Sequence, residues 1–209
     1  MTSNNSKPIA LSYMVGNISI YSPLVTSPVQ VFRSLMAGQA ICRPTYTGTG
    51  VLTLQSSLGR FHVLELSGES WILESGTFWA AQGELDVSFY RERFLTALWC
   101  GQGLMYLQTL VSGHGKVALA TRGPVEEVVL GDGESFVAEA GIVICRSARV
   151  HLTAHCAPKK LRGQPTFGQS GFRKYVGPGK ILLNSAPYWR YRLASEQRGA
   201  SGKGFQFIS

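Results

Sequence analysis

Acidic residues are missing from most of this chain, and their distribution limits what the chain can contact. Of the 12 acids, eleven lie between Glu65 and Glu139 beside only four basic residues, so this stretch has a net charge of −7. The two ends of the chain together hold 16 basic residues and one acid, Glu196. Such ends attract phosphate in nucleic acid or anionic lipid. They could equally form a solvated face, or pair with the acidic middle of a neighbouring subunit.

Long apolar runs and paired cysteines are also scarce. No run approaches the roughly 18 apolar residues of a membrane-spanning helix, and residues 1–8 have no apolar core of the secretory type. No two of the four cysteines are separated by two residues, which excludes the usual zinc and redox spacings. We therefore expect reduced, mostly buried thiols at Cys42, Cys100, Cys145 and Cys156.

Glycine is abundant, at 24 residues, whereas charged residues make up only 15% of the chain. This composition is typical of short strands joined by tight turns, and runs such as Leu104–Leu110 alternate in the manner of a half-buried strand. We predict an all-β fold with structural turns at six glycines. These are Gly48, Gly50, Gly113, Gly115, Gly177 and Gly179.

An internal repeat organises the chain. Residues 38–76 align with 103–141 at a shift of 65, which places Gly48-Thr49-Gly50 on Gly113-His114-Gly115 and Gly68-Glu69-Ser70-Trp71 on Gly133-Glu134-Ser135-Phe136. A third copy is predicted in two halves at the ends of the chain, which would meet and close a ring of three units. The predicted division is a half-copy 9–37, copies 38–100 and 101–156, a basic insert 157–171, a half-copy 172–195 and a tail 196–209.

Residues that could perform chemistry are isolated from one another. No serine lies in a nucleophile elbow, and no Gly-x-Gly pair continues into a phosphate-binding loop. His151 and His155 would share one face of a strand, but Cys156 would point away, and a zinc site needs three or four converging ligands. Glu69 and Glu134 occupy equivalent turns, where a carboxylate can accept backbone N–H groups. We predict no enzyme, no cofactor and no metal site.

Basic and aromatic residues mix in the C-terminal third. Nucleic-acid bases stack on aromatic rings while Arg and Lys hold phosphate, although half of these rings could instead face the core as alternating strand residues. The residues predicted to contact an anion, nucleic acid or lipid are Lys159, Lys160, Arg162, Arg173, Lys174, Arg190 and Arg192.

Three short runs suggest a family. Gly101-Gln102-Gly103-Leu104, Gly133-Glu134-Ser135-Phe136-Val137 and the run from Tyr175 to Leu183, which contains Gly177-Pro178-Gly179-Lys180, resemble the altered-inheritance-of-mitochondria family in its mitochondrial biogenesis branch, formerly a bacterial domain of unknown function. The chain departs from the usual pattern in its weak N-terminal copy, in the basic segment 157–170, and in Asn184-Ser185-Ala186 after the last strand.

The resemblance implies a fold with three units per chain like those of the tryptophan RNA-binding attenuation protein, in a ring-shaped homotrimer without enzymatic activity. For a eukaryotic source it implies a mitochondrial location, on the matrix side or at the inner membrane, and for a bacterial source the cytoplasm. The leading hypothesis is therefore a structural or scaffolding protein that binds an acidic protein partner or anionic lipid and has no transmembrane segment. The alternative is an RNA-binding module that uses the basic and aromatic C-terminal surface.

Overall fold

The computed structural model describes residues 4–6, 11–21, 44–55, 59–92, 107–139, 141–154 and 172–184. Every regular element in these ranges is a β-strand, so the all-β prediction is confirmed for the described residues. The strands are β1 (Asn4–Ser6), β2 (Leu11–Tyr21), β3 (Thr45–Leu54), β4 (Arg60–Leu73), β5 (Phe78–Arg91), β6 (Leu107–Thr121), β7 (Val125–Leu130), β8 (Ser135–Glu139), β9 (Val143–Ser147), β10 (His151–Ala154), β11 (Phe172–Val176) and β12 (Gly179–Asn184).

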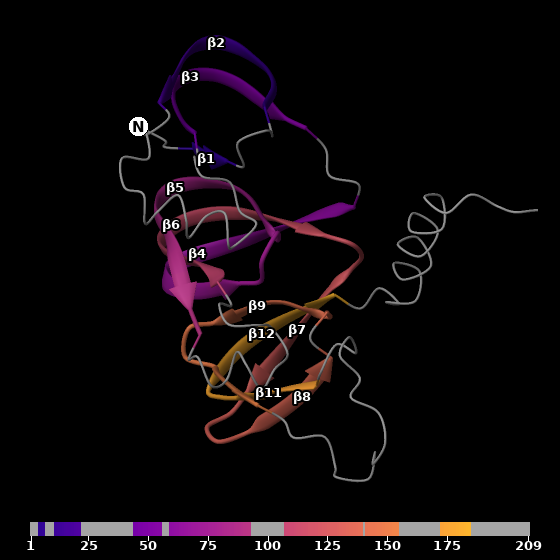
Figure 1. Ribbon diagram of the computed structural model, residues 1–209. Coiled ribbons are helices and arrows are strands. Elements are labelled where there is room, and N and C mark those ends of the chain that lie inside the picture. Colours follow the sequence, from indigo (N-terminus) through magenta and orange to yellow (C-terminus); the bar gives the residue numbers. More distant parts are fainter. Residues whose placement is uncertain are drawn as a thin grey trace, which may run out of the picture.

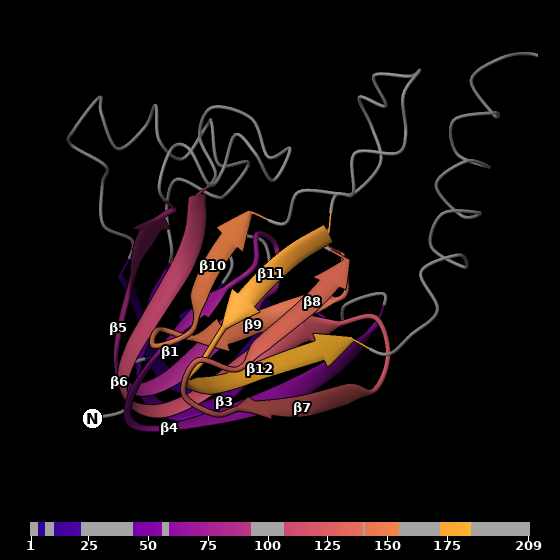
Figure 2. The same ribbon diagram turned by 90° about the horizontal axis from the view of Figure 1, so that it is seen from below.

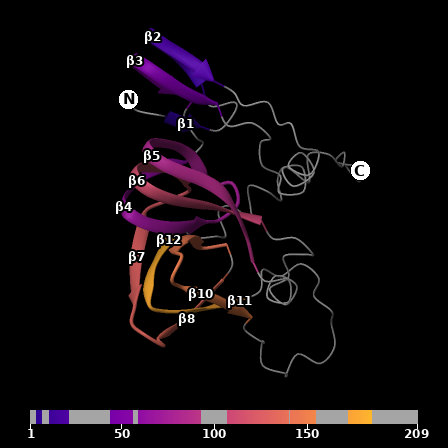
Figure 3. The same cartoon turned by 90° about the vertical axis from the view of Figure 1, so that its left-hand side faces the viewer.

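Nine of these strands form one sheet, in the order β2-β3-β1-β5-β6-β4-β9-β12-β7. Read in threes, this order repeats: β2-β3-β1, then β5-β6-β4, then β9-β12-β7. We refer to residues 4–54, 60–121 and 125–184 as the first, second and third strand groups. Figures 1 and 3 show the groups stacked along the molecule, with β2 at one end and β8 at the other.

Neighbouring groups meet along seams that share one register. At the first seam, β1 pairs with β5 through Asn4↔Gln82, Asn5↔Ala81 and Ser6↔Ala80. At the second seam, β4 pairs with β9 through Trp71↔Ser147, Ile72↔Arg146 and Leu73↔Cys145. Adding 67 to the residue numbers in β1 and 65 to those in β5 gives the paired residues of β4 and β9. The two seams are therefore equivalent in backbone pairing although their side chains differ.

The strands of the third group are divided where those of the second are continuous. The register of β4 shifts between Ser67 and Ser70, around Gly68, and at the equivalent place Gly133 lies in the turn that separates β7 from β8. Strands β8, β10 and β11 consequently form a second sheet, in the order β10-β11-β8. Figure 2 shows this small sheet lying over β9, β12 and β7.

Two buried clusters form the core, one in each of the last two groups. The larger lies in the second group and at its seam with the third, and contains Leu64, Leu66, Trp71, Leu73, Phe78, Ala81, Val111, Val117, Leu119, Ile144, Cys145 and Leu182. The smaller lies between the two sheets of the third group and contains Leu130, Ala138, Val143, Val150, Leu152, Tyr175, Ile181 and Leu183. In the first group only Tyr46 is among the buried hydrophobic residues of the described chain.

Four of the six glycines predicted as turns lie inside strands instead. Gly48 and Gly50 lie within β3, and Gly113 and Gly115 lie within β6. A Cβ added at Gly115 would lie 2.2 Å from the carbonyl oxygen of Gln82 on the neighbouring strand, far inside contact distance. The glycines thus let two strands approach each other closely, a role that the turn interpretation missed. Gly177 and Gly179 do flank the bend between β11 and β12.

The strand groups are bounded at other residues than the predicted copies, and the predicted division stays a prediction. The groups begin at β1, β4 and β7, whereas the predicted copies begin at residues 38 and 101. Sequence matches locate equivalent residues, but pairing between distant strands decides which strands belong together. Within the described residues the nine-stranded sheet ends at β2 and β7 without closing, so the ring stays a prediction.

Candidate functional site: a buried charge cluster and an uncharged outer face

The predicted anion-contact residues do not form a described surface. Lys159, Lys160, Arg162, Arg190 and Arg192 lie outside the described residues. Arg173 is 2% exposed and forms an ion pair with Glu74, so its prediction as a surface contact is wrong. The strand alternation of β11 directs Arg173 and Tyr175 inward and leaves the intervening Lys174 half-buried.

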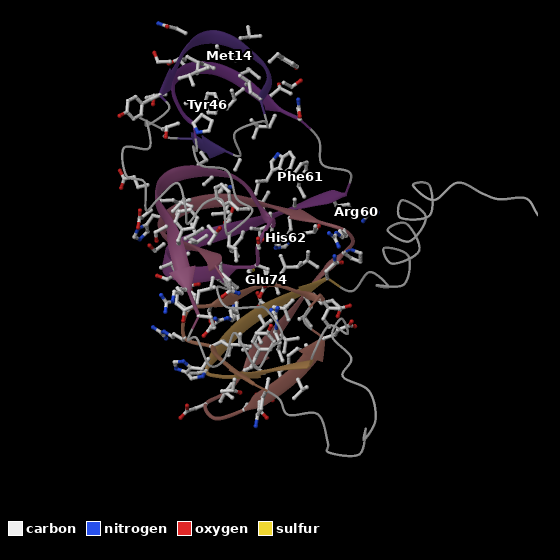
Figure 4. The ribbon with its side chains drawn as sticks, in the orientation of Figure 1. Met14, Tyr46, Arg60, Phe61, His62 and Glu74 are labelled. Carbon is white, nitrogen blue, oxygen red and sulfur yellow. The ribbon has the colours of Figure 1, made fainter. Side chains whose placement is uncertain are left out.

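Arg173 belongs to a buried charge cluster at the second seam, which we define as Glu74, Glu92, Gln108, Arg146, Arg173 and Tyr175. Glu74 follows β4, and Figure 4 shows it at the level where the second and third groups meet. Its Oε1 accepts hydrogen bonds from Gln108 Nε2 at 2.9 Å and from Arg173 Nη1 at 3.0 Å. One carboxylate therefore links β6 of the second group to β11 of the third.

Arg146, on β9, forms the second ion pair of the cluster. Its guanidinium donates to the Glu92 carboxylate, which follows β5, and to the backbone carbonyl of Val150. The same guanidinium lies over the Tyr90 ring, 5.6 Å from the ring centroid. Arg146 and Glu92 are both almost completely buried. Two carboxylates thus balance two guanidinium groups within the protein interior.

Burial sets the protonation behaviour of the cluster. Desolvation raises the pKa of Glu74, and the neighbouring Arg173 opposes that rise. Desolvation and the charge of Glu74 raise the pKa of Tyr175 to about 12. The same two causes raise the pKa of the Cys145 thiol well above its usual value. Tyr175 and Cys145 are therefore neutral at ordinary pH, and they pack rather than react.

The cluster is arranged to hold the two groups together. Its charged atoms face one another across the seam, and removing one partner of a buried pair costs about 3–5 kcal/mol because the other charge is left uncompensated. This arrangement could not be predicted from the sequence, because Glu74, Arg146 and Arg173 are far apart in the chain. Only the pairing of β4 with β9 brings them together.

The two carboxylates predicted in equivalent turns differ from each other, because Glu69 lies within β4 whereas Glu134 lies in a turn. Glu134 Oε2 accepts a hydrogen bond from the backbone N–H of Gly131 at 2.8 Å, which confirms the predicted role. Glu69 Oε2 instead accepts from the indole N–H of Trp71 at 3.3 Å. Within the described ranges no three His, Cys, Asp or Glu side chains are grouped to hold a metal ion. Of the three residues weighed and rejected as metal ligands, His151 lies exposed on β10, while His155 and Cys156 fall outside the described residues.

The outer face of the first group is uncharged and apolar. Tyr13, Val15 and Tyr21 of β2 alternate onto one side of the sheet, and Val51 of β3 lies opposite Val15. These four side chains, which we call the apolar outer face, are 56–68% exposed. Neither β2 nor β3 contains a charged residue.

The second and third groups carry ion pairs on the matching strands. Lys116, which follows Gly115 as Val51 follows Gly50, pairs with Glu65 at 2.7 Å. Lys180, which follows Gly179, pairs with Glu127 at 3.1 Å. The apolar outer face therefore replaces a charged surface by an uncharged one. The sequence contains a signal for this contrast, because the Gly-x-Gly run is followed by Val51 in the first group but by Lys116 and Lys180 in the second and third.

The family model described as Mitochondrial biogenesis AIM24 matches residues 5–186. This chain belongs to that family. The match covers all three strand groups and both seams, and it confirms the resemblance drawn from the glycine-containing runs.

Two bacterial proteins extend the comparison. An uncharacterized protein of Streptococcus pyogenes serotype M6 is 24% identical over 156 residues, which are 73% of this chain and 57% of that relative. This chain thus spans little more than half the length of the relative. The crystal structure of a Streptococcus pyogenes protein superposes with a TM-score of 0.67 at 18% identity, over 94% of this chain and 89% of the other. That likeness shows a shared fold. None of these matches supports the RNA-binding alternative.

No helix among the described residues is long and apolar enough to cross a membrane.

Proposed function

We propose that this protein is a non-enzymatic structural protein that supports the organisation or biogenesis of a membrane. The observation that carries this proposal is the match of the mitochondrial biogenesis family over residues 5–186. In a eukaryotic source the membrane is the mitochondrial inner membrane, and in a bacterial source the protein acts from the cytoplasm. Self-assembly and attachment to anionic lipid are the two activities that this role requires.

The geometry supports a scaffold. The buried charges of this protein join two strand groups, because Glu74, Arg146 and Arg173 face one another at the second seam. The three groups are proposed to be tandem units like those of the tryptophan RNA-binding attenuation protein, in a homotrimer. Their matching seam registers support this reading.

Attachment to lipid is assigned to the basic C-terminal third. From residue 140 to residue 195 the sequence has no acid and ten basic residues. Because Arg173 is buried, we assign the lipid contact to Lys159, Lys160 and Arg162. Their neighbours Pro158 and Gly163 are typical of a loop. Each basic residue near an anionic surface contributes about 1 kcal/mol at low salt.

The test measures binding to vesicles that contain cardiolipin, compared with neutral vesicles. Replacing Lys159, Lys160 and Arg162 by Ala should weaken binding by roughly fivefold per charge at low salt. The matched control replaces Lys116 and Lys180 by Ala, which removes exposed lysines that already pair with Glu65 and Glu127. Equal binding by the parent and the triple variant would reject the basic segment as the lipid contact. Preference for single-stranded RNA over vesicles would reject the membrane role itself.

A further inference from the structure

Two strand edges remain open where the pattern of the other seams calls for a partner. β5 pairs with β1 and β9 pairs with β4. β2 has the same position in its group as β5 and β9 have in theirs, but it pairs only with β3 among the described strands. At the other end, β8 pairs only with β11 within the described residues. Unpaired edges of this kind readily add a strand from another chain.

The edge of β8 is equivalent to the part of β4 that forms the second seam. Trp71 of β4 lies opposite Val111 and Leu73 opposite Thr109. Sixty-five residues later, Phe136 of β8 lies opposite Tyr175 and Ala138 opposite Arg173. Phe136, Val137 and Ala138 therefore stand where Trp71, Ile72 and Leu73 stand one group earlier.

The edge of β2 is equivalent to the part of β5 that forms the first seam. Gly16 lies opposite Gly50, and Gly83 lies opposite Gly115, with a φ of 113° at both Gly16 and Gly83. The shift of 67 between these glycines places Tyr13, Met14 and Val15 on Ala80, Ala81 and Gln82, the three residues that pair with β1.

We propose that β8 of one copy pairs antiparallel with β2 of the next, with Phe136 opposite Val15, Val137 opposite Met14 and Ala138 opposite Tyr13. This third seam rests on the self-assembly part of the proposed function and names the surfaces that form it. The occupant is a second copy because the two edges lie at opposite ends of the stack, as Figures 1 and 3 show. The resulting head-to-tail contact closes into a ring when its rotation allows, as in a trimer.

The chemistry of both edges fits this pairing. Met14, Val15 and Val137 are 41%, 63% and 42% exposed, although each is a large apolar side chain. Figure 4 shows Met14 on the outermost pair of strands. β2 has none of the charged or proline residues that usually protect an edge strand. Its side chains are thus suited to apolar cross-strand contacts with Phe136 and Val137.

A disulfide tests the register directly. Residues opposite each other in antiparallel strands have Cα atoms about 4.5–5.5 Å apart, within the range of a disulfide. A Met14→Cys chain mixed with a Val137→Cys chain should form a covalent dimer under mild oxidation, and the double variant should form linked trimers. Peptide mapping should find the 14–137 linkage, which separates it from any reaction of the four native cysteines.

The matched control pairs Val137→Cys with Ser19→Cys. Ser19 is exposed on β2, the strand that contains Met14, but it does not lie opposite Val137 in the proposed register. The control pair should cross-link at most one tenth as fast. Equal cross-linking of the two pairs, or covalent oligomers of the cysteine variants that lack the 14–137 linkage, would overturn the proposed seam.

Introducing a charge at the proposed seam provides the second measurement. Val137→Glu should weaken self-association at least tenfold in light scattering, because it places a charge opposite Met14 in an apolar contact, and Met14→Lys in the same chain should restore much of it. Unchanged assembly by Val137→Glu, or a parent chain that stays monomeric at micromolar concentration, would reject the seam. Vesicle binding by the same variants reports separately on the membrane role, so failure of the seam is distinguishable from failure of the proposed function.

Discussion

Glu74 is the acceptor shared by Gln108 and Arg173, and its charge compensates a guanidinium that solvent cannot reach. Glu74→Gln keeps the size of the side chain but leaves Arg173 without an ionised partner. We expect the free energy of unfolding to fall by about 3 kcal/mol, as for other broken buried pairs.

Chemical denaturation measures this loss for Glu74→Gln. The control is Glu65→Gln, which removes the carboxylate that pairs with Lys116 on the exposed surface. It should change stability little, because exposed ion pairs contribute little. Equal losses in the two variants would mean that the cluster does not stabilise the second seam.

The pKa of Tyr175 makes the stability of the folded protein fall at alkaline pH. This pKa is raised to about 12 in the folded protein, whereas an unfolded tyrosine titrates near 10. Above pH 10 the unfolded state therefore loses this proton first, and stability falls as pH rises until the folded pKa is passed.

Tyr175→Phe should remove about 1 kcal/mol from the fall in unfolding free energy between pH 10 and pH 11. Tyr21→Phe, at an exposed position of β2, is the matched control for the loss of a tyrosine hydroxyl. A profile that is identical in the parent and in Tyr175→Phe would contradict the assigned pKa.

At the scale of elements, the close approach of β5 and β6 depends on Gly115. Gly115→Ala would place a Cβ 2.2 Å from the Gln82 carbonyl oxygen, so the two backbones must separate. We expect a loss of at least 2 kcal/mol, since steric clashes in a packed core are among the most costly substitutions. Thermal unfolding measures the loss, and Gly131→Ala, whose Cβ would meet only the Glu134 carboxylate at 3.6 Å, should be nearly neutral. A neutral Gly115→Ala would show that the strands can move apart freely.

The same glycines show how far the sequence predicts the elements. Alternation and glycine content predicted strands correctly, and the shift of 65 found equivalent residues such as Gly50 and Gly115. It could not reveal that these glycines lie inside strands, because a positive φ serves a tight turn and a close strand approach equally well. The position of Arg173 was missed for a similar reason. A strand directs alternate residues to opposite faces, and only the pairing partner determines which face is buried.

At the scale of the whole molecule, stability should be uneven. Both core clusters lie in the second and third groups and their seam, while the first group contributes Tyr46 as its buried hydrophobic residue among those described. Amides of β2 should therefore exchange with solvent at least tenfold faster than those of β6. Hydrogen exchange followed by mass spectrometry measures this difference. Uniform protection of β2 and β6 in a monomeric sample would contradict it.

The shared register of the two seams has a consequence for how the chain avoids misfolding. Backbone hydrogen bonds cannot distinguish β1 with β5 from β4 with β9, so an exchange of partners would satisfy the main chain equally well. The side chains differ, because Ala81 lies opposite Asn5 at one seam and Arg146 lies opposite Ile72 at the other. An arginine at the wrong seam would be buried away from Glu92, at a cost of several kcal/mol. The charge cluster therefore makes the observed order of the strand groups far more favourable than an order in which the groups have exchanged partners.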